Sequence, residues 1–267
     1  TAAYNPLTEK IIVGPSGIVN GLSDCTGSNA GQMATDQWSF DPVTLAWTLL
    51  AGANDQYGSV TVGTWFLDSV TGLAFFGSNR NGATRGGYLI NTNTMPPTNA
   101  LVDNVWPFMQ ASGPIAIDTN KKFAVQFSPG AVPIAIAVYD LNGLSMTAYG
   151  TKGQVGSTGV AGGGGPLYKP DMTWTFTGDI SLLSLSDFAV TYNGKLQKFV
   201  AWAGDNTVYF ITPNYQSKTL DVLSKHVYDF PTTTVGLANK FTYIPESDLY
   251  LAFTGTDHDF YYLQPLN

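Results

Sequence analysis

The two arginines of this 267-residue chain, Arg80 and Arg85, lie in one glycine-rich stretch, GSNRNGATRGG, at positions 77–87. A guanidinium group presents a planar fork of donors that suits carboxylates, sulfates and backbone carbonyls. Glycine lets the backbone make a tight excursion at little steric cost. The stretch therefore predicts a loop that holds an anionic group, or else a solvated turn.

The two histidines also have acidic neighbours. His226 lies near Asp229, and His258 stands between Asp257 and Asp259, so that proton transfer or metal binding is one interpretation. Adjacent residues of a strand point to opposite faces, so the three residues 257–259 cannot all converge. We expect a solvated charged loop there, with no metal, no cofactor and no catalytic residue.

Two further catalytic patterns do not fit the sequence. Cys25 with the two histidines and Tyr228 would supply the residue types of a copper-radical site, but the sequence context for such a site is absent. No Gly-x-Ser-x-Gly stretch leads from a strand into a helix. The glycine run VAGGGGPL lacks the ending of a phosphate loop and is expected to be a linker.

The composition bounds the class of protein. Hydrophobic residues make up 44% and charged residues 12%, with 29 glycines and 15 prolines, which predicts a folded chain rich in strands and turns. The net charge of −7, with no basic cluster beyond Lys121 and Lys122, argues against nucleic acid as a partner. No apolar run is long enough for membrane insertion. The single cysteine leaves no internal disulfide. A start at Thr1 indicates a processed product or a fragment, and the composition favours an extracellular location, secreted or surface-associated.

An internal repeat organises the chain. Five segments share a short apolar run, a polar turn and a second apolar run, which is the pattern of a β-hairpin. Their equivalent positions are Tyr4, Phe66, Ile117, Val190 and Tyr243. After each of the first four hairpins comes a further strand, turn and strand, so the repeating unit is a four-stranded antiparallel sheet.

Five such units predict an all-β fold, a five-bladed β-propeller forming a single domain over 1–267. The expected blades are about 1–51, 58–103, 112–150, 186–224 and 233–267, with a long inter-blade insertion at 151–185. The last blade is incomplete, which predicts strand donation by a partner or self-assembly there, unless the strand phase is shifted by one. An all-β sandwich is the alternative fold.

Two stretches carry a family resemblance. DQWSFDPVTLAWTLLAG resembles the half of a kelch repeat in which an aromatic-Asp-Pro turn leads to a tryptophan, and NGKLQKFVAWAGDNTVYFITP is similar to the other half. The double glycine of that repeat is replaced here by other small residues. The resemblance to kelch-like and galactose-oxidase-like propellers implies a fold and no particular activity.

The two ends of such sheets differ in sequence. The short hairpin turns carry Asp41, Asp68, Asp118, Asp140 and Asn193, which could be read as paired acids for glycoside hydrolysis. Because they occupy equivalent turn positions, we expect them to bind their own backbone instead. The longer connections lie at the opposite end, at 14–36, 77–86, 128–133, 204–206, 255–258, 52–59, 104–112, 150–186 and 225–233, and that end is the predicted site. The predicted ligand-binding residues are Tyr57, Arg80, Arg85, Trp106, Tyr168, His226, Tyr228, Asp257 and His258.

The function predicted is recognition of a carbohydrate or a protein ligand by these loops, without catalysis. The first alternative is a secreted carbohydrate-active enzyme, a hydrolase or lyase, with Asp205, Asp229 and Asp257 as its available acids. The second is a structural subunit of an extracellular fibre or spike. The segment MTWTFTGDI, after the glycine run, predicts an ordered flap over the loop end.

Overall fold

The structure is a computed structural model, and it describes residues 2–13, 37–51, 60–68, 71–80, 85–93, 98–103, 114–128, 135–143, 171–185, 187–227, 241–253 and 260–264. Strands β1–β19 dominate these residues, and the described part contains short 3₁₀ helices but no α-helix. Within the same residues no helix has the length and hydrophobicity needed to cross a membrane. The predicted all-β class is thus confirmed.

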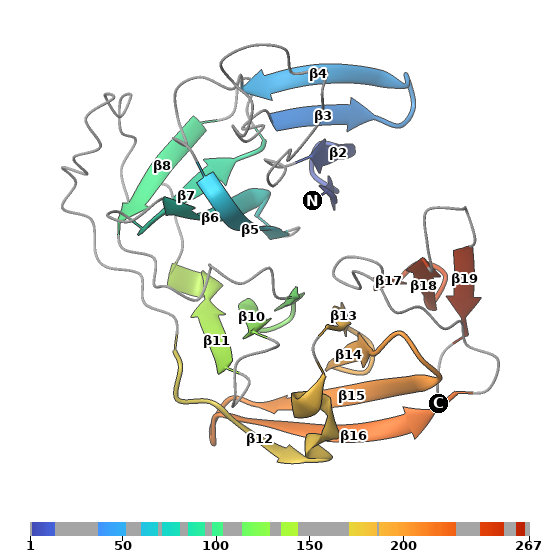
Figure 1. The fold of residues 1–267 in the computed structure, drawn as a ribbon. Coiled ribbons are helices and arrows are strands. Elements are labelled where there is room, and N and C mark those ends of the chain that lie inside the picture. The colour runs from blue at the N-terminus through green and yellow to red at the C-terminus, as the bar shows by residue number, and fades with distance from the viewer. Residues whose placement is uncertain are drawn as a thin grey trace. The chain divides into compact units, whose positions relative to one another are not determined.

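The chain divides into two compact units, which are described separately. The first unit contains two four-stranded sheets, with strand orders β1-β2-β3-β4 and β5-β6-β7-β8 (Figure 1). Their strands are β1 Ala2–Asn5, β2 Lys10–Val13, β3 Gln37–Asp41, β4 Ala46–Ala51, β5 Val60–Asp68, β6 Leu73–Arg80, β7 Arg85–Asn91 and β8 Thr98–Asp103.

The second unit contains three sheets, with strand orders β11-β10-β9, β12-β16-β15-β14-β13 and β17-β18-β19. Their strands are β9 Ile115–Asp118, β10 Phe123–Ser128, β11 Ala135–Asp140, β12 Thr175–Gly178, β13 Ala189–Asn193, β14 Lys198–Trp202, β15 Thr207–Asn214, β16 Thr219–His226, β17 Phe241–Ile244, β18 Leu249–Phe253 and β19 Phe260–Leu263. Two 3₁₀ helices, Leu141–Gly143 and Ile180–Ser184, complete the described elements.

All five hairpins of the predicted repeat form antiparallel pairs. They are β1–β2, β5–β6, β9–β10, β13–β14 and β17–β18, and each opens one of the five sheets. A third strand pairs with the second in every sheet, and a fourth follows in three of them. The hairpin repeat read from the sequence is therefore present as five sheets in the described residues.

The turns explain why the pattern is so regular. At seven hairpin turns the last residue before the next strand has a positive φ: Glu9, Leu45, Gly72, Lys122, Gln197, Lys218 and Asp248. The residue that precedes most of these turns is Asn or Asp, whose side-chain oxygen accepts backbone N–H groups two and three residues on. Asp118 Oδ1, for example, accepts from Asn120 N at 3.0 Å and Lys121 N at 2.9 Å. An Asx side chain closes such a turn in place of a backbone group.

Three details differ from the sequence prediction. Most of the expected loop 77–86 is strand, because Gly77 pairs with Gly87, Ser78 with Gly86 and Asn79 with Arg85. The expected fourth strand of the third sheet falls at 144–150, outside the described residues. The segment expected to form a flap contains β12, which adds to β16 as a parallel fifth strand, with Phe176 opposite Leu220.

The packed core of the second unit lies on both faces of the β13–β16 sheet. On one face Phe127, Phe188, Phe199 and Ile211 belong to a cluster shared with β9–β11. On the other, Trp202, Val208 and Phe210 pack with Phe241 and Tyr250 of β17 and β18. Alternate residues of β15 thus enter opposite clusters, as the two-residue period of a strand requires.

Candidate functional site

The best described part of the predicted loop end is the connection between β14 and β15. Gly204 has a φ of 80°, which lets the chain reverse within residues 203–206. Asp205 Oδ1 accepts a hydrogen bond from Thr207 N at 2.7 Å, and Asp205 O accepts one from Trp202 Nε1 at 2.9 Å. Asp205, one of the acids that an enzyme would need, is therefore engaged in holding this turn.

Asn206, next in the chain, carries an unsatisfied acceptor. Its backbone oxygen accepts from Val227 N at 2.7 Å, but its side-chain Oδ1 is buried and has no hydrogen-bond partner within the described residues. A buried amide oxygen without a donor is costly, by about 1–3 kcal/mol. An acceptor of this kind is suited to a donor brought by a ligand.

His226 is the one predicted histidine that the structure describes. It is exposed, ends β16 and pairs with Thr207 at the start of β15. Because Val227 N bonds to Asn206 O, residues 206 and 226 lie at the same end of one hairpin. The structure therefore brings an imidazole and an amide with an unpartnered oxygen to the same end of this sheet.

Of the other predicted ligand-binding residues, Arg80 and Arg85 lie in strands that the structure describes. Arg80 ends β6 and Arg85 begins β7, so they lie on neighbouring strands, with Asn79 opposite Arg85. Tyr57, Trp106, Tyr168, Tyr228, Asp257 and His258 lie outside the described residues. That the predicted ligand-binding residues gather at one end of the sheets stays a prediction.

Three of the five predicted turn residues, Asp41, Asp118 and Asn193, bind their own backbone as the sequence predicts. Asp41 Oδ1 accepts from Val43 N at 2.9 Å and Thr44 N at 3.1 Å, and these hydrogen bonds lower the pKa of the Asp41 carboxyl. The Asn193 and Asp118 turns have the same geometry. Within the described residues, no group of three or more His, Cys, Asp or Glu side chains is placed to hold a metal ion.

Sequence reasoning missed a second role of the turn residues, which is to link one sheet to the next. Tyr215 donates its hydroxyl to Asp118 Oδ2 at 2.6 Å, and this bond joins the β15–β16 turn to the β9–β10 turn. Burial, followed by the hydrogen bond to Asp118, raises the pKa of the Tyr215 phenol, so it stays protonated as the donor. We call this contact and its counterparts the turn latches.

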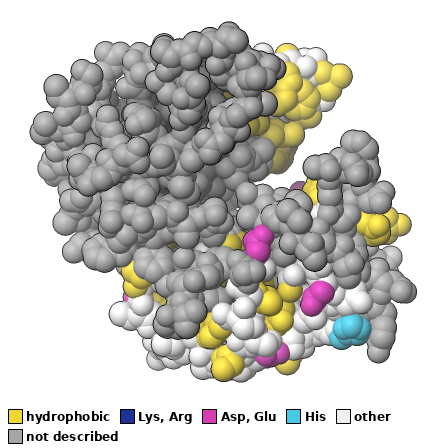
Figure 2. Space-filling model, viewed as in Figure 1, with side chains coloured by type: hydrophobic (Ala, Val, Ile, Leu, Met, Phe, Trp, Pro, Cys, Tyr) yellow, Lys and Arg dark blue, Asp and Glu magenta, His cyan; other side chains and the backbone are white. Residues whose placement is uncertain are grey.

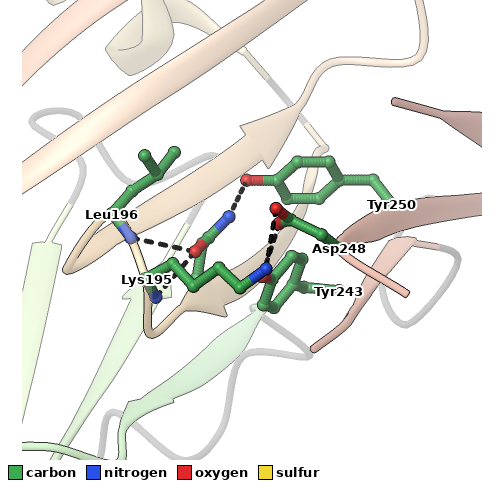
Figure 3. Close-up of polar contacts among 6 residues, drawn as sticks. Lys195, Leu196, Tyr243, Asp248 and Tyr250 are labelled. Carbon is green, nitrogen blue, oxygen red and sulfur yellow. Dashed lines mark hydrogen bonds and ion pairs between the residues drawn. The ribbon is translucent and has the colours of Figure 1, made fainter. Parts of the chain in front are cut away.

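A second latch joins β13–β14 to β17–β18. Asn193 Nδ2 donates to Tyr250 Oη at 2.6 Å, while Lys195 Nζ lies 2.8 Å from Asp248 Oδ2 (Figure 3). Tyr243 also donates to Asp248, at 2.7 Å. Burial and that carboxylate raise the pKa of Tyr243 to about 12. In the first unit the corresponding bond runs from Asn5 Nδ2 to Thr92 Oγ1, at 2.8 Å. Each of these side chains thus takes part in a contact within or between sheets.

A further feature absent from the prediction is an exposed apolar surface on the β3–β4 hairpin. Val43 is 83% exposed, Leu45 70% and Trp47 59%. We call these three residues the hairpin patch, and Figure 2 shows hydrophobic side chains gathered at the surface of this hairpin. Trp47 is backed by Phe40, its cross-strand partner, with ring centroids 4.8 Å apart.

The exposure of Trp47 is not what its position in the repeat requires. The residue six places after the first Asx or equivalent of a turn is fully buried in five other hairpins, as Ala74, Ala124, Phe199, Leu220 and Tyr250. The left-handed position that Leu45 occupies holds glycine or a polar residue at the other six turns. Comparing the turns with one another in sequence would have marked Leu45 but not Trp47, whose counterparts are hydrophobic as well.

The segment that leads into β12 is fixed by an ion pair. Lys218 Nζ lies 2.8 Å from Asp171 Oδ2, and Thr175 N donates to Lys218 O at 3.1 Å. Burial opposes ionisation of Asp171, but hydrogen bonds from Lys218 and Thr173 outweigh it and bring the pKa of Asp171 to about 2. Since the pKa of Asp171 in the folded protein lies below the ordinary value of 3.8, this carboxylate stabilises the fold above pH 3.8 and stops doing so as the pH falls toward 2.

Replacing Lys218 by methionine is accordingly expected to lower the free energy of unfolding by about 0.5–1 kcal/mol near neutral pH, the usual worth of a partly exposed pair. The difference from the unchanged protein should shrink as the pH falls from about 4 to about 2. Urea unfolding at a series of pH values measures it. A difference that persists undiminished at the acid end would mean that Lys218 acts through packing rather than through Asp171.

Comparison with known proteins gives a likeness of fold. The structure is similar to that of an auxiliary nutrient-binding protein from Bacteroides ovatus, with a TM-score of 0.51 and 11% identity over 99% of this chain and 54% of that one. Its counterpart from Bacteroides thetaiotaomicron matches with a TM-score of 0.48 and 10% identity, over the same shares. The allergen Mala s 1 of Malassezia sympodialis matches at 0.48 and 12%, over 95% of this chain and 80% of that one. The chain thus spans about half the length of the two Bacteroides proteins. No family model and no curated protein sequence matches it.

Proposed function

We propose that this protein is a non-catalytic recognition protein that binds a carbohydrate or a protein ligand at the loop end of its sheets. The observation that carries the proposal is the buried, unpartnered Oδ1 of Asn206 beside the exposed end of β16. A hydroxyl or amide N–H of a ligand would satisfy that oxygen. The imidazole of His226, at the same end of the hairpin, is a second polar contact for it.

The comparison with the Bacteroides ovatus protein supports the same kind of role. That protein is named as a nutrient-binding protein, and the two folds are alike over nearly the whole of this chain. A small soluble nutrient such as a sugar presents many hydroxyl groups, which amide side chains bind well. A surface or extracellular location is part of the proposal.

The arrangement of the ligand-binding loops is proposed from the repeat. We take the five sheets as blades of one kelch-like propeller, whose last blade, β17–β19, has an open edge for a donated strand. In that arrangement Tyr57, Trp106, Tyr168 and Tyr228 would supply stacking surfaces around the ligand. Arg80, Arg85, Asp257 and His258 would supply charged and polar contacts, and the arginines would favour acidic ligands.

An array of neutral and acidic glycans tests the carbohydrate form of this proposal. The unchanged protein is expected to bind a defined glycan, and Asn206→Ala to weaken that binding about tenfold, which is the worth of one good hydrogen bond. Gln216→Ala, on the exposed turn at the other end of the same hairpin, is the matched control and should bind normally. Arg80→Ala combined with Arg85→Ala should weaken acidic glycans only. Binding that is unaffected by Asn206→Ala would remove this site from the account, and no binding at all would remove the carbohydrate ligand.

A further inference from the structure

The proposed ligand site does not account for the exposed apolar residues of the hairpin patch. In the described residues Ala46, Trp47 and Thr48 of β4 are all exposed, so side chains on both faces of this outer strand are open to solvent. The same hairpin occurs once more as β15–β16, with a turn of the same length. The two hairpins can therefore be compared residue by residue.

The counterpart of Trp47 in β16 is Leu220, and it is fully buried. Its burial involves β12, the strand that the chain itself adds to the outer edge of β16, in which Phe176 stands directly opposite Leu220. Phe176 packs against the core cluster that contains Leu220. The chain thus shows how the outer strand of this type of sheet is covered, namely by an added parallel strand with an aromatic residue in register.

The hairpin turn beside β4 is not built for stability alone. Leu45 adopts a φ of 57° with 70% of its surface exposed, where the equivalent residues are glycine or polar. A left-handed backbone disfavours leucine, and because this side chain is exposed, no burial of apolar surface offsets that cost. The turn requires the left-handed backbone at this position but does not require leucine, so an exposed leucine there indicates a surface selected for a contact.

We propose that the outer edge of β4 binds an extended polypeptide segment of another protein, which pairs with β4 as β12 pairs with β16. The segment places an apolar or aromatic side chain beside Trp47, in the place that Phe176 takes beside Leu220. Main-chain hydrogen bonds supply affinity, and the side chain against Trp47 and Leu45 supplies selectivity.

The charge near β4 distinguishes a second copy of this chain from a basic segment of another protein as the partner. Strand β4 carries no charged residue, whereas Asp41, which ends β3 directly before the hairpin turn, is kept ionised by its backbone hydrogen bonds. The chain as a whole has a net charge of −7. A second copy would bring like charge to this edge, so a segment flanked by lysine or arginine is favoured.

The test uses a short synthetic peptide in which the sequence of Thr175–Gly178 is flanked by lysine residues. Unchanged protein is expected to bind it in calorimetry, and Trp47→Ala to weaken the binding at least about tenfold. Leu7→Ala, which removes another exposed apolar side chain, in the β1–β2 turn of the same sheet, is the matched control and should bind like the unchanged protein. A peptide that exchanges with the chain's own β12 at β16 would bind Trp47→Ala and the unchanged protein equally, and that result overturns the proposal.

Two further experiments distinguish strand pairing from other kinds of contact. The same peptide with alternate backbone nitrogens methylated should not bind, because it cannot form the ladder; equal binding would exclude strand pairing. Leu45→Asn should weaken the peptide while raising the melting temperature, since asparagine tolerates the left-handed conformation. Trp47-dependent self-association in sedimentation, or Trp47-dependent glycan binding without peptide binding, would assign the hairpin patch to a second copy or to a sugar and overturn the proposal. Because the glycan test rests on Asn206, either proposal can fail without the other.

Discussion

Asp118→Ala is expected to lower the free energy of unfolding of the second unit by about 2–4 kcal/mol, among the largest effects of any polar substitution in the described chain. The Asp118 side chain is buried and uses both oxygens. One closes the β9–β10 turn through two backbone N–H groups, and the other accepts from Tyr215. Alanine removes all three bonds and leaves the Tyr215 hydroxyl without its acceptor.

The chain itself provides the matched control for this prediction. At the equivalent position of the β13–β14 turn stands Asn193, which closes its turn in the same way and donates to Tyr250. Asp118→Asn should therefore cost less than about 1 kcal/mol, with the direction of the latch bond reversed. Tyr215→Phe should cost about 1 kcal/mol, because the turn remains closed. Urea unfolding of the three variants measures these differences. Equal losses of unfolding free energy for Asp118→Ala and Asp118→Asn would mean that the carboxylate charge, and not the turn and latch bonds, is what matters.

Trp202→Ala is expected to destabilise the second unit by about 3–5 kcal/mol. Trp202 is fully buried in the cluster between β13–β16 and β17–β18, near Phe241 at a centroid distance of 6.1 Å. Its removal leaves a large cavity that the two sheets can fill only by shifting. Urea unfolding is the direct measurement, and a loss below about 1 kcal/mol would contradict the assigned packing.

Trp202→Phe separates packing from the positioning of the ligand site. Phenylalanine keeps much of the volume but loses the Nε1 donor that holds Asp205 O at the β14–β15 connection. We expect a loss of about 1–2 kcal/mol in stability, and a weaker affinity for the glycan than that modest loss would suggest. Unchanged glycan affinity in this variant would show that the turn beside Asn206 does not depend on the Trp202 bond.

The hairpins could be predicted from the sequence because their determinants are local. An Asn or Asp, a four-residue turn and apolar residues on either side set the register without help from distant residues, as at Asn193 and Asp118. The glycines at 77 and 86 misled the prediction, since glycine marks loops in sequence but pairs here within β6 and β7.

The contacts that sequence reasoning missed are non-local. Strand β12 pairs in parallel with β16, more than forty residues away, and four residues of Thr-Phe-Thr-Gly give no sign of that partner. The Asp118–Tyr215 and Asn193–Tyr250 latches depend on how one sheet packs on the next. The exposure of Trp47 likewise follows from the absence, within the described residues, of a neighbour that its counterparts have.

Binding without chemical change is the central claim, and mass spectrometry of a glycan after prolonged incubation with the protein tests it most directly. The account predicts that the glycan selected on the array is recovered with its mass unchanged, and that Asn206→Ala binds it about tenfold more weakly. Recovery of a cleaved or eliminated product, in an amount that grows with time and with protein concentration, would contradict it and make the protein an enzyme.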